Sequence, residues 1–157
     1  MKQLSISTFA AAVMLLFGAV NEVNGDPLKY EVVGDTVTIK DCKETASGAM
    51  AIPPIYEGKP VTSIGWGAFS SCSRLTSVRI PDSITSIGES AFWGCSSLTS
   101  VTIGDSVTSI GKYAFRYCKS LTGVTIPDGV TSIGESAFWG CSSLTSIEVG
   151  KGNSEYS

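Results

Sequence analysis

The sequence predicts an α/β repeat fold, a solenoid with short parallel strands on one face and short helices or 3₁₀ turns on the other. Three observations lead to this prediction. One pattern recurs every 23 residues between residues 61 and 149, and each copy changes its hydrophobic period halfway along. A single copy also buries too few apolar side chains to offset its ordering cost, so the copies must stack.

The first 25 residues differ from the rest in composition. Phe9–Val20 is an apolar stretch of twelve, which is typical of a signal-peptide core and short for a membrane span of about 20 residues. Val23 and Gly25 fit a cleavage site before Asp26. We therefore predict a signal peptide at 1–25 and a secreted or cell-surface chain with no membrane span after cleavage. A retained membrane anchor is the alternative.

Residues 26–60 are predicted to form an N-terminal cap built on a β-hairpin. Tyr30–Val33 and Val37–Ile39 flank the Gly-Asp pair at 34–35, a two-residue sequence that favours a tight hairpin turn. Met50–Pro53 then resembles a strand that ends in Ile-Pro, as strands of the following repeats do.

Four copies of one 23-residue unit follow at 61–149. The unit reads V-T-S-I-G-x-x-A-F-x-x-C-x-x-L-T-x-V-x-I-P/G-D-S/G. From Ile64 to Leu75 the apolar residues recur at i, i+4, i+5, i+8 and i+11, which indicates one face of a short helix or 3₁₀ segment. From Leu75 to Ile80 they follow the spacing of a short strand, and a Pro-Asp or Gly-Asp turn ends it. The sixteen residues TSIGESAFWGCSSLTS stand at 85–100 and again at 131–146.

The composite pattern L-x-x-V-x-I-P-x-x-V-x-x-I-G-x-x-A-F-x-x-C resembles the BspA-like leucine-rich repeats of surface and secreted proteins in bacteria and some parasitic protists. The resemblance covers Val61–Val149 and extends weakly to Leu28–Pro60, which is similar to that family's cap. It implies a leucine-rich repeat solenoid that adheres to proteins or to host and matrix surfaces. The Asn that commonly follows the strand is replaced in this chain, so no asparagine ladder is expected; the replacements are Ser83, Ser106 and Gly129.

Residues 150–157 are predicted to be an uncapped tail. A solenoid that ends in a bare strand edge tends to aggregate, and in the family such a segment usually leads into further repeats. The tail therefore indicates a truncated reading frame or the stub of a longer protein.

The composition argues against catalysis and against nucleic-acid binding. The chain contains no His, so the commonest general base and metal ligand is missing. The net charge is −3 and the eleven basic residues are scattered, whereas a phosphate-binding surface needs clustered Lys and Arg. We predict no enzyme activity, no catalytic residue, no cofactor and no metal site.

The unit places one cysteine in each coil, at one repeated position. Such thiols would lie in a row with parallel Cβ vectors, a geometry that suits neither tetrahedral zinc nor a disulfide. We interpret them as small buried apolar residues: Cys72, Cys95, Cys118 and Cys141. Cys42 stands outside the repeat, and it is predicted to be either free or paired with Cys72.

Acidic residues form two further sets. One Asp per coil follows the strand, and we interpret these residues as turn caps, because a calcium site needs six or more oxygens around one point: Asp82, Asp105 and Asp128. Glu89 and Glu135 stand two coils apart, too far for a catalytic pair, and are interpreted as solvated residues.

Two surfaces remain as candidate binding sites. On the strand face the outward positions are small and hydroxyl-rich, and we select Ser77, Arg79, Ser100, Thr102, Thr125, Ser146 and Glu148. On the opposite side Trp93 and Trp139 should point outward, because on a helix they would lie about 160° from the Ala and Cys side, and Tyr117 is nearby. Rings that lie flat over the neighbouring coil are the alternative.

The sequence thus predicts an exported, non-catalytic binding module for protein binding or cell-surface adhesion. The partner is an unknown protein or surface ligand. Two alternatives stay open: a carbohydrate-binding module that recognises a glycan, and a structural fragment of a longer repeat protein with no activity of its own.

Overall fold

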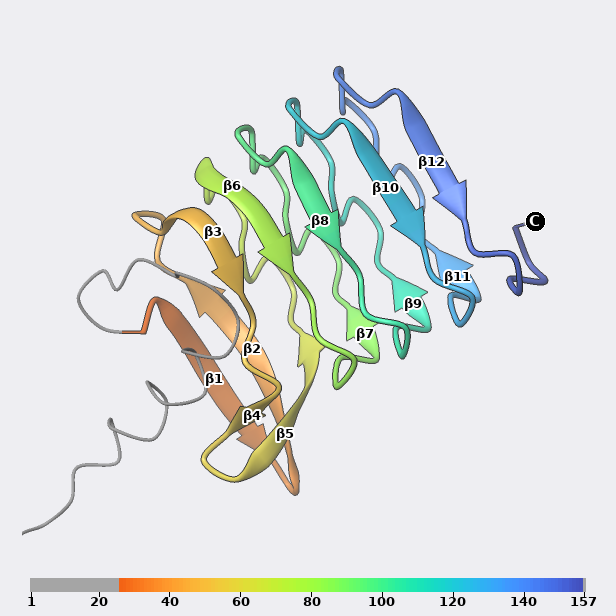
Figure 1. The fold of residues 1–157 in the computed structure, drawn as a ribbon. Coiled ribbons are helices and arrows are strands. Elements are labelled where there is room, and N and C mark those ends of the chain that lie inside the picture. Colours follow the sequence, from red (N-terminus) through yellow and green to blue (C-terminus); the bar gives the residue numbers. More distant parts are fainter. Residues whose placement is uncertain (1–25, 157) are drawn as a thin grey trace, which may run out of the picture.

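The computed structural model describes residues 26–156, which wind coil after coil into a solenoid with two stacks of strands (Figure 1). The predicted signal peptide at 1–25 lies outside the described residues. Sheet A has the order β1-β2-β5-β7-β9-β11, with β4 beside β5. Its strands are β1 (Leu28–Val33), β2 (Thr36–Cys42), β4 (Ile55–Tyr56), β5 (Lys59–Ile64), β7 (Ser86–Ile87), β9 (Ser109–Ile110) and β11 (Ser132–Ile133).

Sheet B has the order β12-β10-β8-β6-β3, and it corresponds to the strand face that the sequence predicted. Its strands are β3 (Ser47–Ala51), β6 (Arg74–Arg79), β8 (Ser100–Thr102), β10 (Gly123–Ile126) and β12 (Ser146–Val149). Neighbours in sheet B pair in parallel, with Val78 opposite Val101 and Val124 opposite Ile147. The predicted parallel pairing is confirmed, and one repeat length separates each pair of partners.

The described residues contain no helix, so the predicted helices or 3₁₀ turns on the second face are wrong. Tight turns take their place, because alternate amides bond in different directions. The amides of Gly67, Phe69 and Ser71 donate to carbonyls of the next coil, whereas the amides between them donate three residues back in their own coil. In an α-helix each of these amides would instead donate to the carbonyl four residues back in the same segment. Gly67 and Ser71 also have φ of 60° and 63°, which a right-handed helix excludes.

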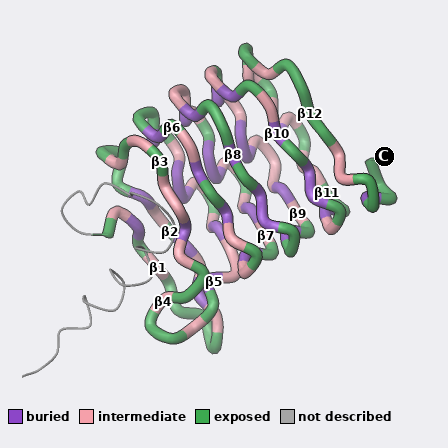
Figure 2. The backbone as a smooth tube through the Cα atoms, viewed as in Figure 1, coloured by how far each residue is buried: buried purple, intermediate pink, exposed green. Residues whose placement is uncertain are grey.

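The core lies between the two sheets and the row of turns, and Figure 2 shows it as a buried inner lining. One phenylalanine per coil stacks on the next. The ring centroids of Phe69 and Phe92 are 4.7 Å apart, those of Phe92 and Phe115 5.1 Å, and those of Phe115 and Phe138 5.4 Å. The near-parallel rings follow from identical backbone geometry in successive coils.

Threonine hydroxyls tie the corners of successive coils together. Each donates a hydrogen bond to the carbonyl of the equivalent threonine one coil earlier: Thr85 to Thr62, Thr99 to Thr76, Thr108 to Thr85, Thr122 to Thr99, Thr131 to Thr108 and Thr145 to Thr122. The repeated Thr of V-T-S-I-G and of L-T-x-V therefore has a structural role that periodicity of apolar residues does not reveal.

The N-terminal hairpin closes the first end of the solenoid. β1 and β2 pair antiparallel, and Gly34 takes φ of 60° at the turn, as the Gly-Asp pair predicted. β2 then pairs in parallel with β5, so the hairpin covers an edge that sheet A would otherwise expose.

The tail at 150–156 folds back onto the last coil. The buried Asn153 side chain donates to two carbonyl oxygens of that coil, at 3.1 and 2.9 Å. The Tyr156 hydroxyl accepts a hydrogen bond from the Ile133 amide at the edge of β11. The tail, expected to carry no capping element, thus covers the β11 side, while β12 is the edge strand of sheet B. The truncated reading frame stays a prediction.

We expect Phe92→Ala to destabilise the fold by about 3–5 kcal/mol, because it removes a fully buried ring that stacks on two others. Urea unfolding followed by circular dichroism measures the change. Thr102→Ala, at an exposed position of β8, is the control and should stay within about 0.5 kcal/mol of the parent. Equal midpoints for the two variants would contradict the stacked core.

Candidate binding surface

Three aromatic side chains meet on the turn side of the solenoid. Trp93, Tyr117 and Trp139 come from three successive coils, and we call them the aromatic row. The ring centroids of Trp93 and Tyr117 are 6.0 Å apart and those of Tyr117 and Trp139 are 5.0 Å apart, both pairs edge to face. Trp93 is 39% exposed and Trp139 is 53% exposed. The rings therefore brace one another across coils and keep part of their faces open to solvent.

Arg116 lies among these rings. Its guanidinium carbon is 4.5 Å from the Trp139 ring centroid, 4.9 Å from that of Tyr113 and 5.0 Å from that of Tyr117. Such cation–π contacts hold a charge without a carboxylate, and within residues 26–156 Arg116 forms no salt bridge. Its side chain rigidifies the aromatic row and adds a cation beside it.

Tyr117 has an unusual backbone. Its φ is 61°, which costs a bulky residue about 1–3 kcal/mol. Glycine stands at the same repeat position in the two adjacent coils, as Gly94 and Gly140. A Cβ on Gly140 would come within 2.7 Å of the Tyr117 ring, so the ring lies directly against that backbone. Tyr117 thus leans toward Gly140 and away from Gly94.

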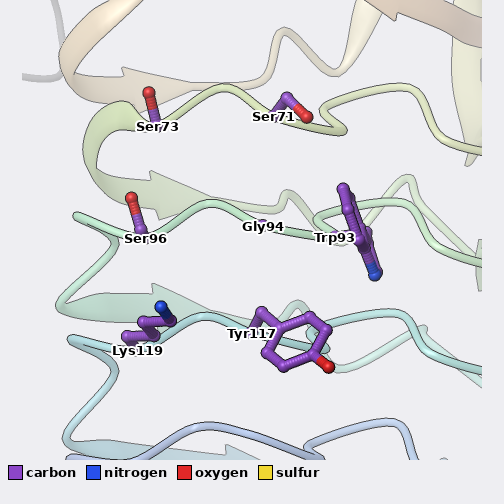
Figure 3. A pocket seen from close by; sticks show the side chains of 7 residues that line it. All are labelled: Ser71, Ser73, Trp93, Gly94, Ser96, Tyr117 and Lys119. Carbon is purple, nitrogen blue, oxygen red and sulfur yellow. The ribbon is translucent and has the colours of Figure 1, made fainter.

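A hollow opens where Tyr117 leans away. Gly94 has nothing within 4 Å of the place where a Cβ would stand, and it forms the floor. The hollow has a volume of about 430 Å³ and is lined by Ser71, Ser73, Trp93, Gly94, Ser96, Tyr117 and Lys119. Figure 3 shows the two rings on one side of Gly94, and Ser73, Ser96 and Lys119 in a row on the other.

Lys119 supplies the only charge of this lining. Its side chain is exposed, and in the described part of the chain it has no ion-pair partner. Lys112 in the same coil differs, because its ammonium is 2.8 Å from the Glu135 carboxylate. That hydrogen bond raises the pKa of Lys112 and lowers the pKa of Glu135. Only Lys119 therefore presents an unneutralised charge to the hollow.

The candidate residues of sheet B lie in two straight rows. Ser77, Ser100 and Ser146 share one row with Gly123, and the second row holds Arg79, Thr102, Thr125 and Glu148. Most are exposed, and Ser77 is half-buried. The rows run along the sheet without converging on one point, so this face is a flat polar surface. Their role in binding stays a prediction.

The repeated cysteines are structural in a way that the sequence did not show. Their thiols donate hydrogen bonds to phenylalanine carbonyls of the preceding coil: Cys95 to Phe69 at 3.1 Å, Cys118 to Phe92 at 3.2 Å and Cys141 to Phe115 at 3.1 Å. The Cys118 thiol, and then burial, raise the pKa of Cys95, and burial raises the pKa of Cys141. The thiols of Cys95 and Cys141 therefore ionise less readily than a free thiol.

Cys42 and Cys72 are both free and buried, so of the two predicted states of Cys42 the structure has the unpaired one. The Cys72 thiol lies 3.8 Å from the carbonyl oxygen of Cys42. A hydrogen bond with the Cys72 thiol, and then burial, raise the pKa of Cys42.

The aspartates act between coils. Asp82 accepts a hydrogen bond from the Asp105 amide at 3.0 Å, and Asp128 accepts one from the Gly152 amide at 3.1 Å. Within residues 26–156 no three His, Cys, Asp or Glu side chains come together as a metal would require. No helix among the described residues is long and apolar enough to cross a membrane.

Sequence reasoning selected the aromatic row but missed the residues beside it. Gly94 and Lys119 line the hollow with three serines, Ser71, Ser73 and Ser96. The repeat already groups these residues in the sequence. Ser71 and Gly94 share one repeat position with Tyr117, and Ser73 and Ser96 share another with Lys119. What the period could not show was that side chains at these two positions line one hollow. Trp66, 74% exposed, was also not selected, and it stands outside the aromatic row.

The geometry defines a class of protein: a β-solenoid of leucine-rich repeats with an exposed aromatic surface. Residues 52–157 match the BspA type leucine rich repeat region in six copies. The chain belongs to this family. The match begins ahead of the first predicted repeat at Val61 and runs through the tail.

Solved structures agree with this assignment. A leucine-rich repeat protein from Bacteroides capillosus is 31% identical with a TM-score of 0.71, over 82% of this chain and 97% of that one. The T. pallidum leucine rich repeat protein is 26% identical with a TM-score of 0.63, over 81% and 71%. A leucine rich cell surface protein from Faecalibacterium prausnitzii is 29% identical with a TM-score of 0.58, over 86% and 44%. No curated protein matches the chain.

The positive φ of Ser71 yields a stability prediction. Ser71→Gly should stabilise the fold by up to about 1 kcal/mol, because glycine adopts φ of 63° without the clash that a Cβ causes. Ser73→Gly, two residues away and without a positive φ, is the control and should be neutral or destabilising. Chemical denaturation of both variants decides between them, and a destabilised Ser71→Gly would contradict the strained turn.

The thiols yield a labelling prediction. In native protein, iodoacetamide should modify half-buried Cys141 before fully buried Cys95 and Cys118. Because the pKa of Cys141 is raised, its labelling rate should keep rising as the pH passes the ordinary thiol pKa. Mass spectrometry of tryptic peptides, which separate the three cysteines, measures each rate. Equal rates at all three sites in folded protein would contradict their burial.

Proposed function

We propose that this chain is an exported, non-catalytic binding module that adheres to a protein or a cell surface through the aromatic row. The observation that carries the proposal is the exposed row itself, in which Trp93, Tyr117 and Trp139 brace one another across three coils. Trp, Tyr and Arg are the residues that contribute most to binding energy at protein interfaces.

The rigidity of the row supports this role. Its rings are held by edge contacts and by Arg116, so little side-chain freedom is lost when a partner binds. The positive φ of Tyr113 and Tyr117, 59° and 61°, recurs at the same two positions of every coil. In this coil those two positions carry large aromatic rings, whereas the other coils have Gly or Ser there. The flat rows of sheet B carry no such feature.

Family membership supports the cellular setting. One similar structure is described as a cell surface protein, and an exported location agrees with the signal peptide that the sequence predicts. The chain contains no His, and no Cys lines the hollow beside the aromatic row, which supports a non-catalytic role.

A carbohydrate-binding module is the second candidate, and the hollow favours it. Aromatic rings beside serine hydroxyls offer an apolar face and a polar rim together, which a sugar ring also presents. A structural fragment with no partner is the remaining alternative, and such a fragment would bind no surface or glycoprotein.

The test is adhesion of the full chain to cultured epithelial cells and to a panel of immobilised extracellular glycoproteins, measured by biolayer interferometry. Trp93→Ala and Trp139→Ala should each weaken saturable binding by at least tenfold, because each removes an exposed ring of the aromatic row. Trp66→Ala is the matched control, since Trp66 is exposed but stands outside the aromatic row.

Two outcomes would contradict the proposal. Loss of binding in Arg79→Ala with no loss in the tryptophan variants would move the contact to sheet B. Folded protein that binds nothing on the panel would favour the structural fragment.

A further inference from the structure

We propose that the hollow beside the aromatic row is a subsite for a carboxylated pyranose sugar in a surface glycan. The inference rests on the proposed function, because it names the ligand chemistry for one part of the same surface. It is carried by three kinds of group around Gly94: aromatic rings, serine hydroxyls and one ammonium.

The rings provide a face for the sugar. A pyranose has an apolar C–H face and a rim of hydroxyls, and burial of that face against aromatic carbon is favourable. Trp93 and Tyr117 meet at an interplanar angle of 82°, so together they form a corner and not a flat sheet. The hollow is a shallow, largely open depression of about 430 Å³, so a sugar ring would rest against the two rings without being enclosed.

The hydroxyls provide partners for the rim. The hydroxyls of Ser71, Ser73 and Ser96 make no hydrogen bond to any other described residue. Ser142, at the repeat position of Ser96, differs because its hydroxyl donates to the Lys119 carbonyl of the preceding coil. The corner threonines Thr99 and Thr122, in contrast, each donate their hydroxyl to a carbonyl of the preceding coil. Free hydroxyls both donate and accept, which matches the mixed donors and acceptors of a polyol.

The backbone of the hollow argues against a peptide. The Gly94 amide donates to Arg116, the Ser71 amide donates to Trp93, and the Gly94 carbonyl accepts from Ser96. A bound extended peptide relies on unused main-chain groups, and those of the floor are already bonded within the solenoid. The hollow therefore recognises its ligand through side chains.

The ammonium selects an anion. Lys119 is the only charged residue in the lining and has no ion-pair partner in residues 26–156, within a chain of net charge −3. A charge-assisted hydrogen bond to a carboxylate would satisfy it. One lysine suits a single carboxylate, whereas phosphate recognition usually draws on clustered arginines.

The test uses tetragalacturonate as the probe and its methyl ester as the matched neutral sugar, with the full chain and tryptophan fluorescence as the readout. We expect saturable quenching by tetragalacturonate and at least tenfold weaker binding of the ester, because esterification removes the charge that Lys119 meets. Lys119→Ala should lose the same factor, and Lys119→Arg should retain much of the affinity. Lys112→Ala, in the same coil but already paired with Glu135, should bind like the parent.

A second variant blocks the space without touching the charge. Gly94→Asn should abolish binding, because the new side chain would occupy the hollow. The variant should still fold, since nothing lies within 4 Å of the added Cβ and asparagine tolerates φ of 73°. Gly34→Asn is its control, at a positive-φ glycine that also has nothing within 4 Å, and it should bind normally.

The outcomes separate the two proposals. Equal affinity for tetragalacturonate and its ester, or full binding by Gly94→Asn, overturns the subsite. Absence of quenching together with adhesion that still depends on Trp93 and Trp139 overturns the subsite and leaves the proposed function standing. Sugar binding that requires Lys119, in a chain that fails to adhere to any surface, supports the subsite and contradicts the wider function.

Discussion

The hydrogen bonds between successive coils on the turn side are the constraint on which this structure depends. Alternate amides there donate to the next coil, and each coil repeats the arrangement. The bonds fix the rise and the register, so phenylalanine falls on phenylalanine and threonine on threonine. They also require two left-handed residues per turn segment, and the turns therefore cannot close into helices.

Because successive coils are so alike, a residue that departs from the repeat changes the surface locally. The two copies of TSIGESAFWGCSSLTS have the same sequence and different surroundings. In the first copy Gly94 faces open space, and in the second Gly140 is covered by the Tyr117 ring. One residue between the copies accounts for the difference, because Tyr117 takes a position that glycine holds in the coils on both sides. The hollow and the aromatic row are therefore two consequences of one substitution within the repeat.

The use of hydroxyl and charged groups divides the molecule into frame and surface. Threonine hydroxyls, cysteine thiols and aspartate carboxylates bond between coils and hold the frame. The serine hydroxyls and the Lys119 ammonium at the hollow make no such bond between coils. Arg116 is held by aromatic rings and by a hydrogen bond that it donates to the Tyr117 hydroxyl. The serine hydroxyls and the Lys119 ammonium, which are not used in bonds between coils, are free to contact a ligand. This fits a binding module in a family of leucine-rich repeats.

The sequence by itself determined the repeat, the parallel strands, the N-terminal hairpin, the buried positions and the family, because a strict period forces equivalent residues into equivalent places. It also placed Trp93 and Trp139 outside the core. Only the tertiary structure decided that the second face consists of turns, since the apolar spacing of Ile64 to Leu75 cannot tell amides that bond within a coil from amides that bond to the next. The same limit hid the hollow. Gly94 and Lys119 line it from two successive coils, and the left-handed turn residues beside them leave no mark in the hydrophobic pattern.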